Sequence, residues 1–179
     1  MTEIIHLIEE SGAIRRGKFK LSNGELTDYY IDKYAFETDH EVLSAITDRL
    51  LSIFDFDDID VVAGPELGAV PLVTALSLRS GIDAAFIRNR EKHRGTQARV
   101  EGTIGKGSRV AVIEDVSTTG GTILDAAALV EDVGGLAEQL IVIVDRGEGA
   151  VENARQKGYE LNYVLQVGED FELKPSTGQ

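Results

Sequence analysis

Acidic, hydroxyl and glycine residues follow one another in the stretch from Val110 to Thr122, which reads VAVIEDVSTTGGT. Its β-branched residues predict a buried strand that ends at the adjacent carboxylates Glu114 and Asp115. The hydroxyls and glycines that follow predict a loop that opens a helix. Backbone N–H groups in such a loop bind phosphate, and Ser and Thr hydroxyls add further donors. No Gly-Lys-Ser/Thr triplet follows, which excludes a nucleoside-triphosphate P-loop.

The two carboxylates indicate what else the ligand carries. A carboxylate accepts hydrogen bonds from neighbouring hydroxyls, as an acidic residue does for ribose in dinucleotide-binding folds. A 5-phosphorylated ribose has both the phosphate and the paired hydroxyls, and negative charge beneath it would stabilise a cation developing at the anomeric carbon. The structural alternative is a helix N-terminus with stabilising acidic residues. That alternative does not account for the three hydroxyls and two glycines between Asp115 and Thr122.

A second group of candidate residues lies in the basic segment RNREKHRGTQAR, residues 88–99. Five of the eighteen basic residues of the chain fall within these twelve positions: Arg88, Arg90, Lys92, Arg94 and Arg99. Only Glu91 opposes them, in a chain whose net charge is −13. This local positive charge favours an anionic ligand such as a diphosphate group. The segment lacks periodicity and is typical of a mobile lid, with a solvated surface loop as the alternative.

The order of the apolar runs predicts the elements that position these residues. Strands alternate with helices, as in an α/β protein whose parallel sheet is covered on both faces. The five strands are expected at 59–63, 83–88, 109–114, 138–145 and 159–167. The helices are expected at 2–10, 39–53, 66–80, 120–133 and 149–158. Ligands bind at the carboxyl ends of parallel strands, so the loops starting at Gly64, Arg88, Glu114 and Asp145 should share one edge.

The N-terminal part is expected to form a small additional unit. Residues 17–34 alternate polar and apolar side chains and predict an irregular β element. Asp39 is suited to cap the helix that follows it. We expect a single domain with an N-terminal hood over 1–36, an α/β core over 37–167 and a tail over 168–179.

The stretch VAVIEDVSTTGGT resembles the phosphoribosyl-diphosphate motif of the type I phosphoribosyltransferases. Four further segments extend the similarity over nearly the whole chain and make it most similar to the orotate phosphoribosyltransferases: FKLSNGELTDYYID, GPELGAVPL, FIRNREKHRG and VDRGEGA. The resemblance implies a phosphoribosyl transfer from 5-phosphoribosyl 1-diphosphate (PRPP) to orotate. The products would be orotidine 5-phosphate and diphosphate, a step of pyrimidine (UMP) biosynthesis.

The resemblance also implies the site residues. Ribose and 5-phosphate would be held by Glu114, Asp115, Val116, Ser117, Thr118, Thr119, Gly120, Gly121 and Thr122. Thr118 and Arg146 would bind orotate, whose carboxylate suits a guanidinium group. Arg88 and Lys92 match a diphosphate-binding pattern that acts in trans across a homodimer. Lys92 and Asp115 are the expected catalytic residues, and Mg²⁺ would be carried by the diphosphate without ligands from the protein.

Several positions depart from the pattern of that family. Asn89 replaces a lysine, and Arg94 replaces a histidine, with His93 one position earlier. Ser22 and the pair Glu66-Leu67 also stand where relatives carry a lysine and a tyrosine-lysine pair. Since Arg94 cannot donate a proton near neutral pH, these changes concern rate and affinity more than the class of ligand.

Two aromatic residues and one arginine leave alternatives open. Alternation lets only one of Tyr29 and Tyr30 face the site, and we expect Tyr30 to flank the base. Arg146 has a structural alternative as a surface residue paired with Glu148 or Asp145. Its expected place at the carboxyl edge of the sheet favours a binding role.

The overall composition excludes several classes of protein. A net charge of −13 opposes a general nucleic-acid surface. The chain has no cysteine, which excludes disulfides and thiolate nucleophiles, and it has no apolar run long enough to span a bilayer. We therefore expect a soluble, cytoplasmic protein. The excess of acidic residues indicates a host with a salty cytoplasm, with an acidic mesophilic enzyme as the alternative.

Two other functions remain open at this point. One is a phosphoribosyltransferase for another base, such as xanthine or uracil, although Arg146 and the N-terminal segment favour an acidic pyrimidine. The other is a non-catalytic regulator that senses PRPP. The residues before Gly17 leave no room for a DNA-binding helix-turn-helix, which argues against a regulator that binds DNA.

Overall fold

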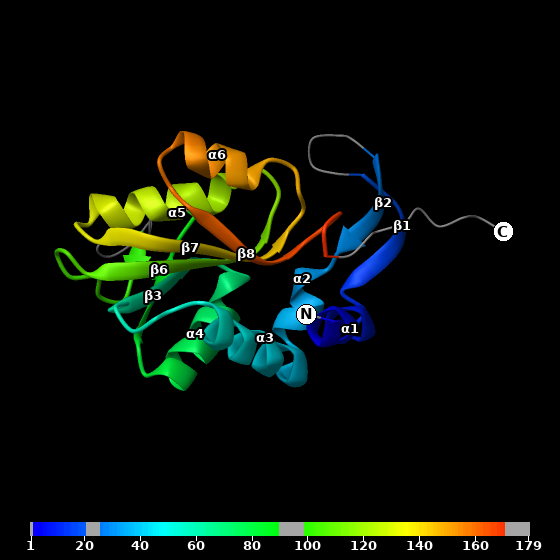
Figure 1. Cartoon of the computed structure of the whole chain (residues 1–179), viewed down its shortest axis with the longest axis horizontal. Helices are drawn as coiled ribbons and strands as arrows, with labels where there is room; N and C mark the ends of the chain where they lie inside the picture. The colour runs from blue at the N-terminus through cyan, green and yellow to red at the C-terminus, as the bar shows by residue number, and fades with distance from the viewer. Residues whose placement is uncertain (1, 21–25, 90–98, 171–179) are drawn as a thin grey trace.

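A six-stranded sheet forms the centre of this computed structural model, which describes residues 2–20, 26–89 and 99–170 (Figure 1). The strands, in spatial order, are β5 (Val100–Glu101), β4 (Asp83–Ile87), β3 (Val61–Pro65), β6 (Arg109–Ser117), β7 (Leu136–Asp145) and β8 (Leu161–Gln166). Neighbouring strands run parallel, except that β5 pairs antiparallel with β4. The predicted α/β class is confirmed, but the predicted count of five strands, all parallel, is wrong. β5 has only two residues, too few to leave an apolar run in the sequence.

Helices cover both faces of this sheet, α3 and α4 on one and α5 and α6 on the other (Figure 1). Their bounds are α3 (His40–Ile53), α4 (Ala69–Ser80), α5 (Gly121–Asp132) and α6 (Ala150–Gln156). Asp39 caps α3 as predicted, because its side chain accepts hydrogen bonds from the backbone N–H groups of Glu41 and Val42. Within the described ranges, no helix has the length and apolar character needed to cross a membrane.

Alternate residues of the central strands enter two separate apolar cores. Ile113 and Ile141 belong to the core that also contains residues of α3 and α4. Val112 and Val142 belong to the core that contains residues of α5 and α6. Successive side chains of a strand point to opposite faces, so a strand covered on both sides is apolar throughout. This explains why the strands appear in the sequence as continuous runs such as VAVI.

The N-terminal residues form a small unit at one end of the sheet (Figure 1). Its elements are α1 (Thr2–Glu10), β1 (Ile14–Lys20), β2 (Leu26–Ile31) and α2 (Lys33–Glu37). β1 and β2 pair antiparallel, with a register irregularity between Arg16 and Phe19, in the region where an irregular β element was predicted. Buried residues of this unit, including Ile8 and Phe36, join the core on the α3 and α4 side. This packing places α2 next to the carboxyl end of β6, as the contact between Lys33 and Asp115 demonstrates.

Candidate active site

Two adjacent carboxylates lie near the end of β6, as the sequence predicted. Glu114 and Asp115 are each only 4% exposed. β6 continues to Ser117, three residues beyond the predicted end, because the register with β7 extends to the pair Ser117 and Asp145. Asp145 is itself buried and its carboxylate accepts from Gly147 N–H (3.1 Å) and Gln166 Nε2 (2.7 Å), so it shapes the turn after β7.

Glu114 has a perturbed acidity. Burial raises the pKa of Glu114 to about 7, and the negative charge of Asp115 adds to this rise. Hydrogen bonds from the hydroxyls of Ser117 and Thr122 act in the opposite direction. Ser117 is buried, and its hydroxyl group interacts with this carboxyl group. Near neutral pH, Glu114 is therefore partly protonated and partly ionised. Binding of a charged ligand nearby would shift the balance between these two forms.

Asp115 is held by a cation and by the backbone. Its Oδ1 accepts a hydrogen bond from Val116 N–H (2.6 Å), and its Oδ2 lies 2.8 Å from Nζ of Lys33. Burial lowers the pKa of Lys33, but the hydrogen bond and charge of Asp115 and the charge of Glu37 outweigh it, so the net pKa is raised. Lys33 thus stays protonated and neutralises part of the acidic charge beside the strand end.

The loop after β6 is open and glycine-rich. Thr118, Thr119, Gly121 and Thr122 are exposed, as expected for a loop that receives a ligand. Gly120 has φ +80°, a left-handed conformation, and a Cβ there would lie 3.3 Å from the backbone of α6. The first backbone N–H groups of α5 follow directly, and these have no carbonyl partner within the helix. The loop can therefore donate several N–H groups to one anion.

One residue of α6 and the residue directly after β7 fix this loop from the other side. Nδ2 of Asn153 donates to the carbonyl oxygen of Thr119 (2.9 Å), and the N–H of Arg146 donates to that of Ser117 (2.9 Å). The side chain of Arg146 is largely buried and its Nη2 lies 2.8 Å from Oε1 of Glu148. Arg146 therefore makes one of the ion pairs anticipated as an alternative while standing next to the loop.

The guanidinium group of Arg146 also stacks over an aromatic ring. Its Cζ lies 5.1 Å from the centroid of Tyr29, which is half-buried. Tyr30 is 45% exposed and packs against Phe19, with ring centroids 5.6 Å apart. The tyrosine beside Arg146 is thus Tyr29, and the expectation that Tyr30 flanks the base stays a prediction.

The two ends of the basic segment are paired with each other. The N–H of Arg88 donates to the carbonyl oxygen of Arg99 (2.7 Å), and Nε of Arg99 donates back to that of Arg88 (3.3 Å). Nη1 of Arg88 lies 3.6 Å from Oε1 of Glu101. Lys92, with the other predicted basic residues between 90 and 98, lies outside the described residues.

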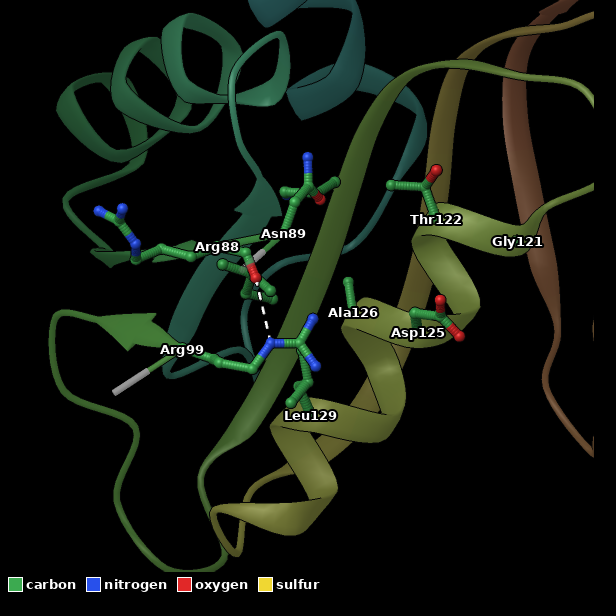
Figure 2. A pocket seen from close by; sticks show the side chains of 10 residues that line it. Arg88, Asn89, Arg99, Gly121, Thr122, Asp125, Ala126 and Leu129 are labelled. Atoms are coloured by element: carbon green, nitrogen blue, oxygen red, sulfur yellow. Dashed lines mark hydrogen bonds between the residues drawn. The ribbon is translucent and has the colours of Figure 1, made fainter. Parts of the chain in front are cut away.

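A pocket of about 340 Å³ lies between the end of β4 and the first turns of α5 (Figure 2). Figure 2 shows Arg99 extending towards Leu129 of α5, whereas the side chain of Arg88 points away from the helix. Thr122 and Asp125 lie on the opposite wall. The pocket therefore joins the basic segment to the glycine-rich loop.

Two of the departures from the family pattern contact each other. The N–H of Asn89 donates to Oε1 of Glu66 (3.1 Å), and its Nδ2 donates to the Glu66 carbonyl oxygen (3.0 Å). Asn89 stands in place of a lysine and Glu66 in place of a tyrosine, so this contact pairs a neutral amide with a carboxylate. This pair ties the start of the basic segment to the loop before α4.

Most of the predicted site residues lie at one edge of the sheet, and three residues that the sequence did not single out join them. Glu114, Asp115, the loop over 117–122 and Arg146 are brought together, with Arg88 at the end of β4. The residues that were missed are Lys33, Glu37 and Asn153. No group of three or more His, Asp or Glu residues that could hold a metal ion was found in the described parts of the chain.

Comparison with known proteins gives a consistent result. A family model described as a phosphoribosyl transferase domain matches residues 36–161. An orotate phosphoribosyltransferase from Methanopyrus kandleri is 43% identical over 162 residues, which cover 90% of this chain and 87% of that protein.

Solved structures agree with this match. The orotate phosphoribosyltransferase from Aeropyrum pernix superimposes with a TM-score of 0.82 at 33% identity, covering 91% of this chain and 93% of that one. The enzyme of Mycobacterium tuberculosis in complex with 5-phospho-α-D-ribosyl 1-diphosphate gives a TM-score of 0.74 at 32% identity, covering 92% and 94%. The similarity therefore spans the hood as well as the core.

Proposed function

This chain belongs to the phosphoribosyl transferase family, among its orotate phosphoribosyltransferases, and from that premise we propose that it transfers the phosphoribosyl group of PRPP to orotate. The reaction releases diphosphate and forms orotidine 5-phosphate for pyrimidine biosynthesis. The observation that carries this proposal is the juxtaposition of the buried pair Glu114 and Asp115, the open loop after β6 and the guanidinium group of Arg146.

Each part of the substrate has a matching group in this arrangement. Glu114 and Asp115 accept hydrogen bonds from the ribose hydroxyls and place negative charge near the anomeric carbon as the bond to diphosphate breaks. The backbone N–H groups over 117–122 receive the 5-phosphate. Arg146, over the ring of Tyr29, binds the orotate carboxylate, and Thr118 contacts the same base. Orotate is already an anion, so positioning and electrostatics supply most of the acceleration.

The proposed cofactor is Mg²⁺ that enters with the diphosphate. The carboxylates of Glu114 and Asp115 already interact with hydroxyls, a backbone N–H and Lys33. This arrangement fits an ion held by substrate oxygens and water instead of protein carboxylates. When bound, such an ion would neutralise charge that develops on the leaving diphosphate.

We further propose a homodimer in which Lys92, with Arg88, acts on the diphosphate of the neighbouring subunit. The concentration of five basic residues within 88–99 supports this role, because their positive charge suits a diphosphate group. The net charge of −13 and the absence of cysteine support a cytoplasmic enzyme from a host with high internal salt.

The test is the release of diphosphate by the purified protein from PRPP and Mg²⁺ with orotate, uracil or xanthine in separate reactions. We expect diphosphate to be released in the reaction with orotate and not in the reactions with uracil or xanthine. Release only with another base would assign a different phosphoribosyltransferase, and binding of PRPP without turnover would assign a regulator.

A variant of Arg146 tests the base specificity within the same assay. Arg146→Gln removes a charge-assisted contact worth about 1.5–3 kcal/mol, so the KM for orotate should rise roughly 10- to 100-fold with a smaller change for PRPP. Arg155→Gln, an exposed residue of α6, is the matched control. An unchanged KM for orotate in the Arg146 variant would contradict the assigned role.

A further inference from the structure

A buried acid that the proposed mechanism does not use lies beside Asp115. Glu37 is the last residue of the single-turn helix α2 and is 2% exposed. Lys33 is the first residue of the same helix, four positions earlier, so both side chains lie on one face. Lys33 reaches Oδ2 of Asp115 at 2.8 Å. The helix thus brings one ammonium group and one carboxyl group to the same aspartate.

Glu37 has no ordinary hydrogen-bond donor. Among the described residues, no N–H or O–H group donates to either of its carboxyl oxygens, although both are buried. The carboxyl group of Asp115 lies beside it, since an oxygen of each carboxyl group crowds the same side of Gly68. Two carboxyl groups in contact do not both ionise in a site closed to water, and one proton shared between them satisfies both.

The electrostatic surroundings assign that proton to Glu37. Burial, the hydrogen bond to Asp115 and its negative charge raise the pKa of Glu37 to about 9. The charge of Lys33 lowers it, and that of Asp32 raises it further. These groups, from α2, the residue before it and β6, are those that act on Glu37.

The backbone of Gly68 completes the enclosure. A Cβ at Gly68 would lie 1.6 Å from Oδ2 of Asp115 and 2.6 Å from Oε1 of Glu37. The two carboxyl groups are therefore packed against the loop between β3 and α4.

From these contacts we propose that Glu37 and Lys33 are positioning residues, which hold Asp115 in its place beneath the ribose through a carboxyl–carboxylate hydrogen bond on one side and an ion pair on the other. The inference rests on the proposed function of Asp115. Loss of the Glu37 proton replaces the hydrogen bond by repulsion and adds negative charge next to an anionic substrate. Binding of PRPP should weaken in consequence.

The main experiment compares the pH dependence of kcat/KM for PRPP in the wild type and Glu37→Gln. Glutamine keeps the shape and the donor but cannot ionise. In the wild type, kcat/KM should fall through an apparent pKa near 9, reaching about tenfold below its plateau one pH unit higher. This alkaline fall should be absent from Glu37→Gln, whose activity near pH 7 stays close to that of the wild type.

Two other variants separate positioning from general stability. Glu37→Leu removes the donor and should lower kcat/KM for PRPP at every pH, an effect that Gln rescues. Glu41→Gln carries the matched substitution in an exposed position of α3 and should keep the wild-type profile. An alkaline fall of equal size in the wild type and Glu37→Gln would overturn the proposal, as would a Leu variant with normal kinetics.

A spectroscopic measurement keeps this inference separate from the proposed reaction. At pH 8, above the pKa of about 7 of Glu114, the infrared band of a protonated carboxyl group should be present in the ligand-free wild type, should disappear as pH rises through about 9 and should be strongly reduced in Glu37→Gln. Absence of that difference overturns the proton assignment whether or not the protein turns over orotate. An inactive wild type that shows the band refutes the proposed function instead. If Glu37→Gln fails to fold, the wild-type titration decides alone.

Discussion

Glu114 and Asp115 are neighbours in one strand, yet the groups around them differ. Asp115 faces the ammonium group of Lys33, whereas Glu114 meets the hydroxyls of Ser117 and Thr122. Because burial raises the pKa of Glu114 to about 7, part of the protein carries it protonated at neutral pH. In the proposed reaction, positive charge that develops at the ribose would favour the ionised form of Glu114, so the negative charge of this carboxyl group would increase as the bond to diphosphate breaks.

The raised pKa of Glu37 predicts that the folding stability of the protein depends on pH. The pKa of Glu37 rises from 4.5 to about 9 on folding, so between these values the folded state binds a proton that the unfolded state releases. Stability from this group therefore decreases as pH rises, by at most about 1.4 kcal/mol per pH unit. Gln does not titrate, so the Glu37→Gln variant should not lose this stability. The free energy of unfolding of the variant should therefore increase relative to that of the wild type as pH rises from about 5 to about 9.

Urea denaturation of both proteins at several pH values measures this difference. The variant minus wild-type difference in unfolding free energy should increase steadily with pH. Glu41→Gln should show no such increase relative to the wild type. A difference that stays constant over the range would mean that Glu37 is ionised in the folded protein.

Single residues of the motif could be predicted from the sequence because their chemistry is local. Glu114, Asp115 and the loop after them are consecutive, so a strand end is enough to bring them together. Lys33 and Glu37 contact Asp115 only after the hood has packed against the core, and no pattern in the sequence carries that information. The contact between Arg146 and Tyr29 could not be predicted for a related reason, because alternation predicts two faces but not which one meets Arg146. That Tyr30 flanks the base stays a prediction.

At the scale of elements, α6 supports the glycine-rich loop through one side-chain contact. Nδ2 of Asn153 donates to the carbonyl oxygen of Thr119. Asn153→Ala removes this hydrogen bond, worth about 1 kcal/mol, and should raise the KM for PRPP roughly fivefold with little change in kcat. Steady-state kinetics with saturating orotate measure the effect.

Gln156→Ala is the matched control for that variant, because Gln156 is an exposed amide on the same helix and contacts only Glu152 among the described interactions. Its KM for PRPP should stay at the wild-type value. Equal kinetics in both variants would indicate that the loop keeps its conformation without α6.

The elements themselves were predictable in proportion to their length. The long strands and helices of the core were found within a few residues, since each buries an apolar face over many positions. The two-residue β5 and the five-residue α2 were not found, because neither is long enough to show a period. Both short elements adjoin the site. The prediction was therefore weakest for the parts of the site that lie outside the motif over residues 110–122.

At the scale of the whole molecule, the acidic surface predicts a dependence on salt. The chain has 31 acidic and 18 basic residues, and their mutual repulsion is screened over about 10 Å at 0.1 M salt but only about 3 Å at 1 M. The melting temperature should therefore rise by several degrees between these concentrations of KCl, since about 1 kcal/mol corresponds to roughly 2–4 °C for a chain of this size.

Scanning calorimetry in KCl, with sucrose as an uncharged stabiliser for comparison, measures this rise. Screening predicts that KCl stabilises at concentrations where sucrose has little effect. A melting temperature that is the same or lower at 1 M KCl would refute an adaptation to a salty cytoplasm.

The stacking of Arg146 on Tyr29 has a consequence for how this protein could be re-engineered. Tyr29 lies in β2 of the N-terminal unit and Arg146 directly follows β7, so the proposed orotate-binding wall is assembled from opposite halves of the polypeptide. A chimera that exchanges only α1, β1 and β2 would change that wall and would keep Lys33 and Glu37 beside Asp115. Exchange of this segment between relatives should therefore change which base is accepted, whereas the binding of PRPP should stay that of the chain that supplies the core.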